Sequence, residues 1–155
     1  MRASAADAAR RSVLLAGLAA IVAGTFLPWL RSGTVERNSY RAGDVLRRIE
    51  QLPSALHFLM DVWPFLSLVC AAAAALALLG IDRAALTLAG LCAVVAGTTS
   101  AVVLLRGSQG LVRAVSTGPL VTLVGSVLIF ATVLVSMARI QLGLGRRPYP
   151  IRRGR

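Results

Sequence analysis

Few residue types capable of catalysis occur in this 155-residue chain, which has one histidine, two cysteines, six acidic residues and no lysine. His57 belongs to no Ser–His–Asp arrangement or paired-acid pattern that the sequence supports, so no hydrolytic or acid–base centre is indicated. Cys70 and Cys92 fall in separate apolar stretches without a partnering histidine, which favours small buried side chains over a disulfide or a metal site. We therefore expect no enzymatic activity, no cofactor and no metal.

Charged residues are also missing from four apolar stretches of the chain. Each stretch is long enough for a helix to cross a hydrocarbon layer of about 30 Å, at a rise of about 1.5 Å per residue. Hydrophobic residues make up 57% of the chain, against about 45–50% in a soluble domain. We therefore predict an all-α fold class, a polytopic membrane protein built as a four-transmembrane-helix bundle. The predicted spans are residues 12–30, 62–81, 84–105 and 119–138.

These spans leave too few residues for a second folded domain. Residues 1–138 are therefore predicted to form a single membrane domain, followed by a basic cytoplasmic tail over residues 139–155. Ionisable groups inside spans usually mark the routes of ions or protons. Their absence here argues against a proton relay, a voltage sensor or an ion-coupled carrier.

The seventeen basic residues are all arginine, and they give the chain a formal charge of +11. Because this charge flanks apolar spans, anionic lipid headgroups are a simpler partner than nucleic acid, which we do not expect to bind. The side that holds both termini carries ten arginines and two acids, whereas the other side carries seven arginines and four acids. Since cytoplasmic flanks are rich in arginine, we predict a bacterial inner (plasma) membrane protein with both termini in the cytoplasm.

Both tryptophans stand at predicted span boundaries. Trp29 closes the first span and Trp63 opens the second, each beside a proline. This placement predicts two rings at the same outer interface of the membrane, where an amphipathic ring is favoured. An aromatic clamp for a ligand is the alternative.

The first span has a second interpretation, because a basic start followed by an apolar run is also typical of a secretory signal peptide. The run continues to Leu30, however, and no small-x-small cleavage pattern follows it. We therefore expect the segment to be retained as a membrane anchor.

Residues 31–61 are the longest segment predicted outside the spans. From about Tyr40 to Leu52, apolar side chains recur at helical spacing, which predicts a short amphipathic helix in this outer loop. Asn38 or Ser39 can cap its start, and Pro53 prevents its continuation. Such a helix can lie on the outer leaflet, on the tops of the spans, or against a partner protein.

Further along this loop, His57 and Asp61 are one helical turn apart, which allows a pH-sensitive pair but is also common at a solvated membrane surface. The loop and its flanks provide the candidate interaction surface. It comprises Trp29, Arg31, Tyr40, Arg47, Arg48, His57, Asp61 and Trp63.

Small residues recur at intervals of four in three of the spans, which places them on stripes where helix backbones can approach closely. These candidate helix-packing residues are Ala16, Ala20 and Gly24 in the first span, Ala93, Gly97 and Ala101 in the third, and Gly118, Thr122 and Ser126 in the fourth. The pattern predicts a tight bundle. The same stripes can instead bind helices of a larger complex or of a homo-oligomer.

One motif carries a resemblance. The stretch Thr25-Phe-Leu-Pro-Trp-Leu-Arg-Ser-Gly33, followed by Arg37-Asn-Ser-Tyr40, resembles a group of uncharacterised small actinobacterial four-span membrane proteins. In that group the first span ends in a Pro-Trp-x-Arg-Ser-Gly-like motif, and a polar loop precedes three more spans. The resemblance implies the layout but no activity, because none is assigned to the group.

Taken together, these patterns predict a non-enzymatic integral membrane protein that acts as an accessory or scaffold subunit of a bacterial cell-envelope complex. Its expected partners are the lipid bilayer and other membrane proteins. A transport component for a lipid or a hydrophobic small molecule is the alternative, which a groove lined by Thr98, Thr99, Ser100, Thr122 and Ser126 would favour. A membrane enzyme using the loop acids with His57 is a third and weaker hypothesis.

Overall fold

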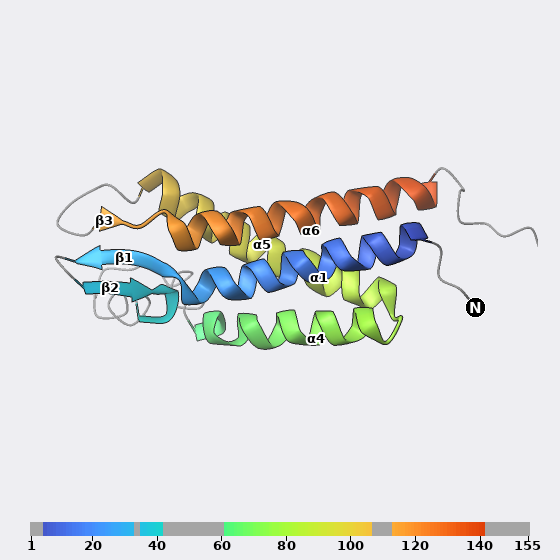
Figure 1. Cartoon of the computed structure of the whole chain (residues 1–155), viewed down its shortest axis with the longest axis horizontal. Coiled ribbons are helices and arrows are strands. Elements are labelled where there is room, and N and C mark those ends of the chain that lie inside the picture. Colours follow the sequence, from blue (N-terminus) through green and yellow to red (C-terminus); the bar gives the residue numbers. More distant parts are fainter. Residues whose placement is uncertain (1–4, 33–34, 42–60, 107–112, 142–155) are drawn as a thin grey trace, which may run out of the picture.

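The computed structural model describes residues 5–32, 35–41, 61–106 and 113–141. Four helices lie lengthwise beside one another, and a small sheet stands at one end of them (Figure 1). Successive helices run in opposite directions, so the start of the first and the end of the last lie at the same end (Figure 1). The elements are α1 (Ala5–Phe26), β1 (Pro28–Ser32), β2 (Val35–Asn38), the 3-10 helix η1 (Trp63–Phe65), α4 (Leu66–Leu78), α5 (Asp82–Arg106), β3 (Arg113–Ala114) and α6 (Thr117–Gln141).

Three of these helices are long and apolar enough to cross a membrane. They are α1, α5 as far as Leu105, and α6 as far as Arg139. The fourth predicted span, residues 62–81, is a shorter apolar helical stretch, Trp63–Leu78. It begins as a 3-10 turn that contains Pro64 and it ends before Gly80.

The hairpin between α4 and α5 explains that early end. Gly80 has a φ of +81°, a conformation in which a side chain is strained. The Ile81 N–H donates to the Leu76 carbonyl at 2.9 Å, and the Gly80 N–H donates to the Ala77 carbonyl at 3.3 Å. This pair of hydrogen bonds is the Schellman arrangement, which terminates a helix and turns the chain toward α5.

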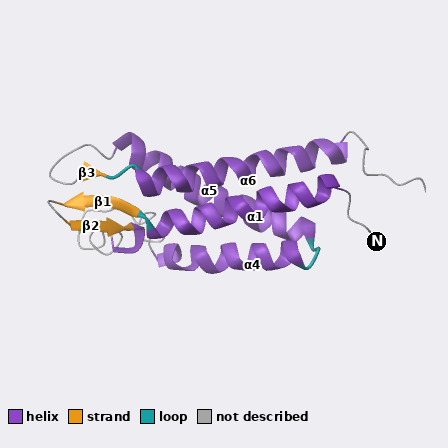
Figure 2. Cartoon of the chain, viewed as in Figure 1, coloured by secondary structure: helices purple, strands orange, loops and turns teal. Residues whose placement is uncertain are grey.

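The all-helical prediction is wrong at the other end of the bundle, where three short strands pair in the order β2-β1-β3 (Figure 2). The first span was expected to continue to residue 30, but α1 ends at Phe26. Pro28 lacks the N–H that a continuing helix would use, and the chain from Pro28 becomes a strand. Both neighbours of β1 are antiparallel to it, with Arg31 opposite Glu36 on one side and Arg113 on the other.

Only the start of the predicted loop helix falls within the described part of the chain. Residues 39–41 are helical, and the Asn38 side-chain oxygen accepts a hydrogen bond from the Arg41 N–H at 3.1 Å. Asn38 therefore occupies the capping position that the sequence offered to it or to Ser39. The rest of the predicted helix lies outside the described residues, as does most of the predicted tail, since α6 itself extends to Gln141.

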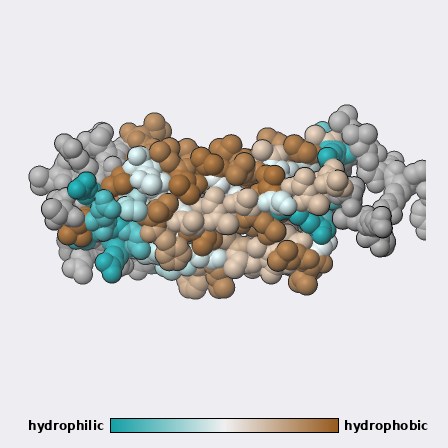
Figure 3. Space-filling view, viewed as in Figure 1, coloured by the Kyte–Doolittle hydropathy of each residue, from teal (hydrophilic) through white to brown (hydrophobic). Residues whose placement is uncertain are grey.

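Apolar side chains lie on the outer surface of the bundle as well as in its core. Large apolar side chains are exposed along the helices, among them Leu68 at 67%, Leu105 at 83% and Leu134 at 65% exposure. Hydrophobic residues cover the length of the helices, while hydrophilic residues gather toward the two ends (Figure 3). Within the described residues, the buried polar side chains are hydroxyls: Thr25, Ser39, Ser100, Thr122, Ser126, Thr132 and Ser136.

Helices α1 and α6 approach so closely that glycine is required between them. A Cβ built on Gly24 would lie 2.8 Å from the Thr122 backbone nitrogen, and one on Gly125 would lie 2.7 Å from the Gly17 carbonyl oxygen. In α5, a Cβ built on Gly97 would lie 3.1 Å from the Ser126 side chain. Backbone-to-backbone contact of this kind is how membrane helices gain packing energy without a hydrophobic driving force between them.

Candidate functional site

The sheet end of the bundle holds an aromatic cluster, which we define as Trp29, Trp63 and Tyr40 with the hydroxyls of Thr25, Ser39 and Ser67. The two indole rings meet edge to face, with centroids 5.6 Å apart. Trp29 is 3% exposed and Trp63 is 9% exposed. The sequence placed both rings at the same end as membrane-interface anchors. They do share an end, but they are buried against each other within the protein.

Each polar atom of this cluster has a partner. Trp29 Nε1 donates to the Gly24 carbonyl at 2.7 Å, and Trp63 Nε1 donates to Ser39 Oγ at 3.1 Å. Ser39 Oγ in turn donates to the Thr25 carbonyl at 2.7 Å. These bonds satisfy the groups that a helix end leaves open, because Gly24 and Thr25 lie in the last turn of α1.

The Tyr40 hydroxyl joins three segments of the chain. It lies 2.7 Å from Ser67 Oγ on α4 and 3.3 Å from Thr25 Oγ1 on α1. Its ring also contacts that of Phe26, with centroids 5.4 Å apart. Tyr40 therefore links the segment after β2 to two helices.

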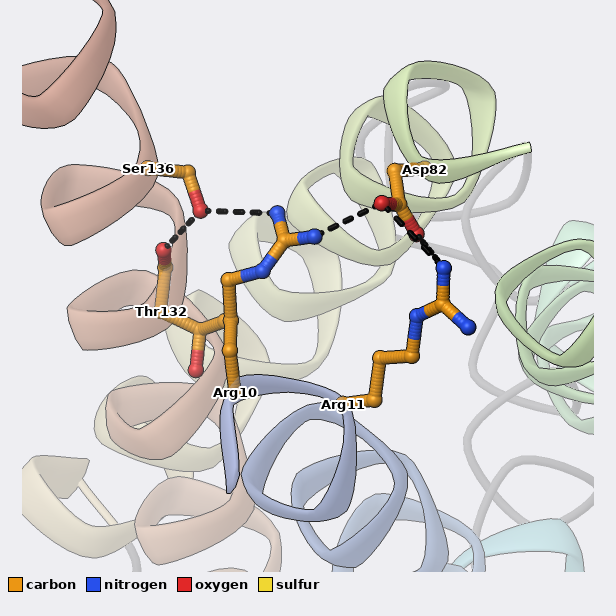
Figure 4. Close-up of polar contacts among 5 residues, drawn as sticks. All are labelled: Arg10, Arg11, Asp82, Thr132 and Ser136. Carbon is orange, nitrogen blue, oxygen red and sulfur yellow. Dashed lines mark hydrogen bonds and ion pairs between the residues drawn. The ribbon is translucent and has the colours of Figure 1, made fainter. Parts of the chain in front are cut away.

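The opposite end holds an arginine cluster, which we define as Arg10, Arg11, Asp82 and Ser136. Asp82, the first residue of α5, lies between the two guanidinium groups that α1 supplies (Figure 4). Arg10 Nη2 is 2.7 Å from Asp82 Oδ2, and Arg11 Nη2 is 3.3 Å from Asp82 Oδ1. Arg10 Nη1 also donates to Ser136 Oγ on α6 at 3.4 Å (Figure 4). The cluster thus ties three helices together.

The cluster has more hydrogen-bond donors than acceptors. Nε of Arg10 and Nε of Arg11 are buried, and neither has a hydrogen-bond partner among the described residues. A buried donor without a partner costs about 1–3 kcal/mol, so its presence in a folded protein calls for an explanation. One carboxylate also faces two guanidinium groups, which leaves an excess positive charge.

The structure gathers some of the predicted interaction residues and leaves others apart. Trp29, Tyr40 and Trp63 meet in the aromatic cluster. Arg31 lies in β1 and Asp61 lies just before η1; both are exposed and both take part in interactions. Arg47, Arg48 and His57 lie outside the described residues.

The predicted packing stripes are also only partly inside the bundle. Gly24, Ala93, Gly97, Gly118, Thr122 and Ser126 are buried, Ala20 and Ala101 are half-buried, and Ala16 is exposed. In α1 the buried positions are instead Leu14, Gly17, Leu18, Ile21, Gly24 and Thr25. This face repeats at intervals of three and four rather than strictly four, because a helix turns every 3.6 residues.

Sequence reasoning did not single out the arginine cluster. Arg10, Arg11 and Asp82 entered only the count of ten arginines and two acids on the side that holds both termini. A usable signal exists, because Asp82 is the acid of a hairpin that the predicted topology places beside the start of the first span. An acid and two adjacent arginines at the same end of a bundle are expected to form ion pairs.

The two cysteines meet in the core between α4 and α5. Both are buried and neither forms a disulfide. Among the described residues, no group of three histidine, cysteine or acidic side chains is placed to hold a metal ion.

Comparisons with known proteins add no relative to these observations. No protein-family model matches the chain, no curated protein matches it, and no solved structure matches it.

Proposed function

We propose that this chain is an integral membrane protein in which all four helices cross the bilayer, and that it acts as a non-enzymatic accessory or scaffold subunit of a cell-envelope complex. The observation that carries the proposal is an apolar outer surface around a packed interior whose buried hydroxyls bond within the bundle. Such a molecule is suited to lipid on the outside, and its described interior holds no charged side chain that would mark an ion or proton route.

The outer surface supports membrane insertion of α1, α5 and α6. Exposed leucine, valine and phenylalanine side chains lie along the helices, whereas the charged residues of the described helices lie near their ends. In water, an exposed apolar surface of this extent would drive aggregation. In a bilayer it is the surface that meets the acyl chains.

The proposal extends to α4 with an adjustment in length. Its 13 residues with the 3 of η1 make a helical stretch of about 24 Å, somewhat less than a hydrocarbon layer of about 30 Å. Local thinning of the bilayer accommodates a difference of this size. The exposed Leu78, Leu79 and Ile81 also extend the apolar surface past the end of the helix.

For orientation, we place the arginine cluster on the cytoplasmic side, with both termini. Over the whole sequence, the side that holds both termini carries ten arginines and two acids, against seven arginines and four acids on the other side. This difference follows the positive-inside tendency of membrane proteins. The aromatic cluster and the sheet then face outward.

The hydroxyls that a transport groove would need donate hydrogen bonds to backbone carbonyls of their own helices. Ser100 Oγ donates to the Ala96 carbonyl at 2.7 Å, and Thr122 Oγ1 donates to the Gly118 carbonyl at 3.0 Å. Thr98 is exposed while Ser100 is buried, so the run 98–100 does not line one surface. The close approach of α1 to α6 also leaves no space between those two helices. These features favour a packed subunit over a carrier.

Two measurements test the proposal. After cell lysis, the protein is expected to stay in the membrane pellet through alkaline carbonate washing and to dissolve only in detergent. Affinity purification in a mild detergent, followed by mass spectrometry, is then expected to recover a protein partner in stoichiometric amount. Recovery from the carbonate supernatant would refute membrane insertion, and purification of a lone chain that moves lipid between vesicles would refute the accessory role.

A matched pair of substitutions tests for lateral contact. Ala16 is exposed on α1 and Ala131 is exposed on α6. Ala16→Leu and Ala131→Leu add the same volume to different outward faces without touching the core. If only one variant loses the partner, the contact lies on the helix face that carries that alanine. If both variants retain the partner, the contact involves neither alanine.

A further inference from the structure

We propose that the arginine cluster is a binding site for the phosphate group of an anionic membrane lipid, held where α1, α5 and α6 meet at the membrane surface. This inference rests on the proposed membrane location. It differs from a general attraction between a basic tail and the headgroups, because it names a site built by three helices of the bundle.

The first argument is the supply of donors. Each guanidinium has five N–H groups arranged in a planar fork that matches a phosphate. Asp82 accepts from Nη2 of Arg10 and from Nη2 of Arg11, and Ser136 accepts from Nη1 of Arg10. Both Nε groups are left without a partner in the described structure, although both are buried. A ligand with several acceptor oxygens would satisfy the N–H groups of Arg11 that Asp82 leaves over, because the Arg11 side chain is 36% exposed.

The second argument is charge. Two guanidinium groups share a single carboxylate, so the cluster has an unbalanced positive charge even with its ion pairs formed. Asp7 lies one helical turn before both arginines and takes part in an interaction, whereas Arg83 adds a further positive charge beside Asp82. A phosphate monoanion or diester at this position would complete the charge balance, whereas a cation or a neutral solute would not.

The third argument is preorganisation and access. Asp82 and Ser136 hold Arg10 in place, and the Arg10 side chain is 18% exposed. The Arg11 side chain is 36% exposed, so a ligand can reach the cluster from the side of Arg11. Because the side chains are already fixed, little conformational entropy is lost when a ligand binds.

The position of the cluster favours a lipid over a dissolved anion. The two arginines precede the charge-free part of α1, at the depth where the phosphates of a bilayer leaflet lie. Anionic lipids present these phosphates at a high local concentration, and they also place acyl chains beside the exposed apolar residues of α1, α5 and α6. A free phosphate would need to leave bulk water without that second contact.

The test uses the full chain in a neutral detergent, with native mass spectrometry to count bound phosphatidylglycerol against phosphatidylcholine. The wild-type protein is expected to retain phosphatidylglycerol selectively. Arg11→Gln is expected to weaken that retention about fivefold, the equivalent of about 1 kcal/mol for one arginine contact. Arg83→Gln removes the same charge from an exposed position at the same end and is expected to change retention by less than about twofold.

Three further readouts make the result decisive. Arg11→Lys keeps the charge but removes Nε, and is expected to bind more weakly than the wild type, since a lysine cannot reproduce the fork. Equal loss in the Arg11→Gln and Arg83→Gln variants would overturn the site in favour of general charge attraction. Displacement of the lipid by millimolar inorganic phosphate would overturn the lipid as the occupant. Either of these two results, in a protein that resists carbonate extraction, would refute the lipid site alone. The proposed membrane location would still stand.

Discussion

The two ends of the bundle join their helices through different side-chain interactions. At the sheet end, the open carbonyls of α1 accept from the Trp29 indole and from Ser39, and the Trp63 indole donates to Ser39, so the cluster is neutral and saturated with hydrogen bonds. At the arginine end, helices are joined by charges that are partly exposed, and two donors have no partner among the described residues. The first end is suited to stability. The second has the donors for the lipid binding that we propose.

The contrast also concerns how each end depends on the helices. The aromatic cluster requires close packing, because Trp29 occupies the space where Gly118 has no side chain. The arginine cluster spans its helices with long side chains and tolerates small changes in their separation. Substitutions at the sheet end are therefore expected to cost more stability than substitutions at the arginine end.

The largest effect is expected from Gly118→Ala. Its new Cβ would lie 2.5 Å from the Trp29 indole nitrogen and 2.8 Å from the Pro28 carbonyl oxygen, so both a ring and a backbone segment must move. Overpacking of this kind costs about 3 kcal/mol. Thermal unfolding in detergent measures the loss. Gly90→Ala is the control: its nearest neighbour is Val133 at 3.9 Å, and a gain of up to about 1 kcal/mol from helix propensity is expected. Equal melting temperatures for the two variants would contradict the close packing at Trp29.

Ser39→Ala is expected to have the next largest effect. The hydroxyl accepts from Trp63 Nε1 and donates to the Thr25 carbonyl, and the side chain is 6% exposed. Its removal leaves a buried indole N–H without this acceptor, at a cost of about 2 kcal/mol. A chemical or thermal unfolding curve in detergent gives the value. Trp63 fluorescence is expected to shift as its surroundings change, and an unchanged spectrum would show that the indole does not depend on Ser39.

The sequence was sufficient to predict the apolar helices and their order. Long runs without charge almost always form helices that cross a membrane or pack in an apolar core. The positions of α1, α5 and α6 were therefore predicted to within several residues. The predicted end of α1 was wrong because the residues from Leu27 to Leu30 are apolar, and apolar residues occur both in membrane spans and in strands. Hydropathy does not distinguish a span from a strand. The strand forms because it pairs with Val35–Asn38 and with Arg113–Ala114, and this pairing depends on the tertiary fold rather than on the local sequence.

The candidate sites were predicted less well, for a related reason. Tryptophan at a span boundary has the same sequence signature whether its ring faces lipid or the protein, and only packing against Gly118 and Trp63 decides it. Likewise, Arg10 and Asp82 are 72 residues apart, and their pairing follows from helix order and rotation rather than from any local motif. Sequence identified the residue types at both ends but not which of them meet.

A smaller loss of stability is expected for Asp82→Asn. The substitution removes the carboxylate that both arginines share, but the Asp82 side chain is 35% exposed and water partly compensates. We expect a loss of about 1 kcal/mol in unfolding experiments in detergent, with Arg83→Gln as a nearly neutral control. Because Asp82 holds Arg10 in place for the lipid, phosphatidylglycerol should stabilise the variant less than it stabilises the wild type. Equal stabilisation of the two proteins would show that Asp82 does not position the arginines for the lipid.

The smallest effect is expected for Ser136→Ala, which is the counterpart of Ser39→Ala at the opposite end. Ser136 Oγ donates to the carbonyl of Thr132 at 2.7 Å, but this carbonyl is already part of the helical ladder. Its contact with Arg10 Nη1 is long, at 3.4 Å, and Arg10 keeps Asp82 as its main partner. Hydrogen bonds between membrane helices average about 0.6 kcal/mol, and this one should contribute less than about 0.5 kcal/mol. A loss for Ser136→Ala that equals the loss for Ser39→Ala would show that the two ends are equally dependent on their hydroxyls, and the division between a saturated end and a binding end would then fail.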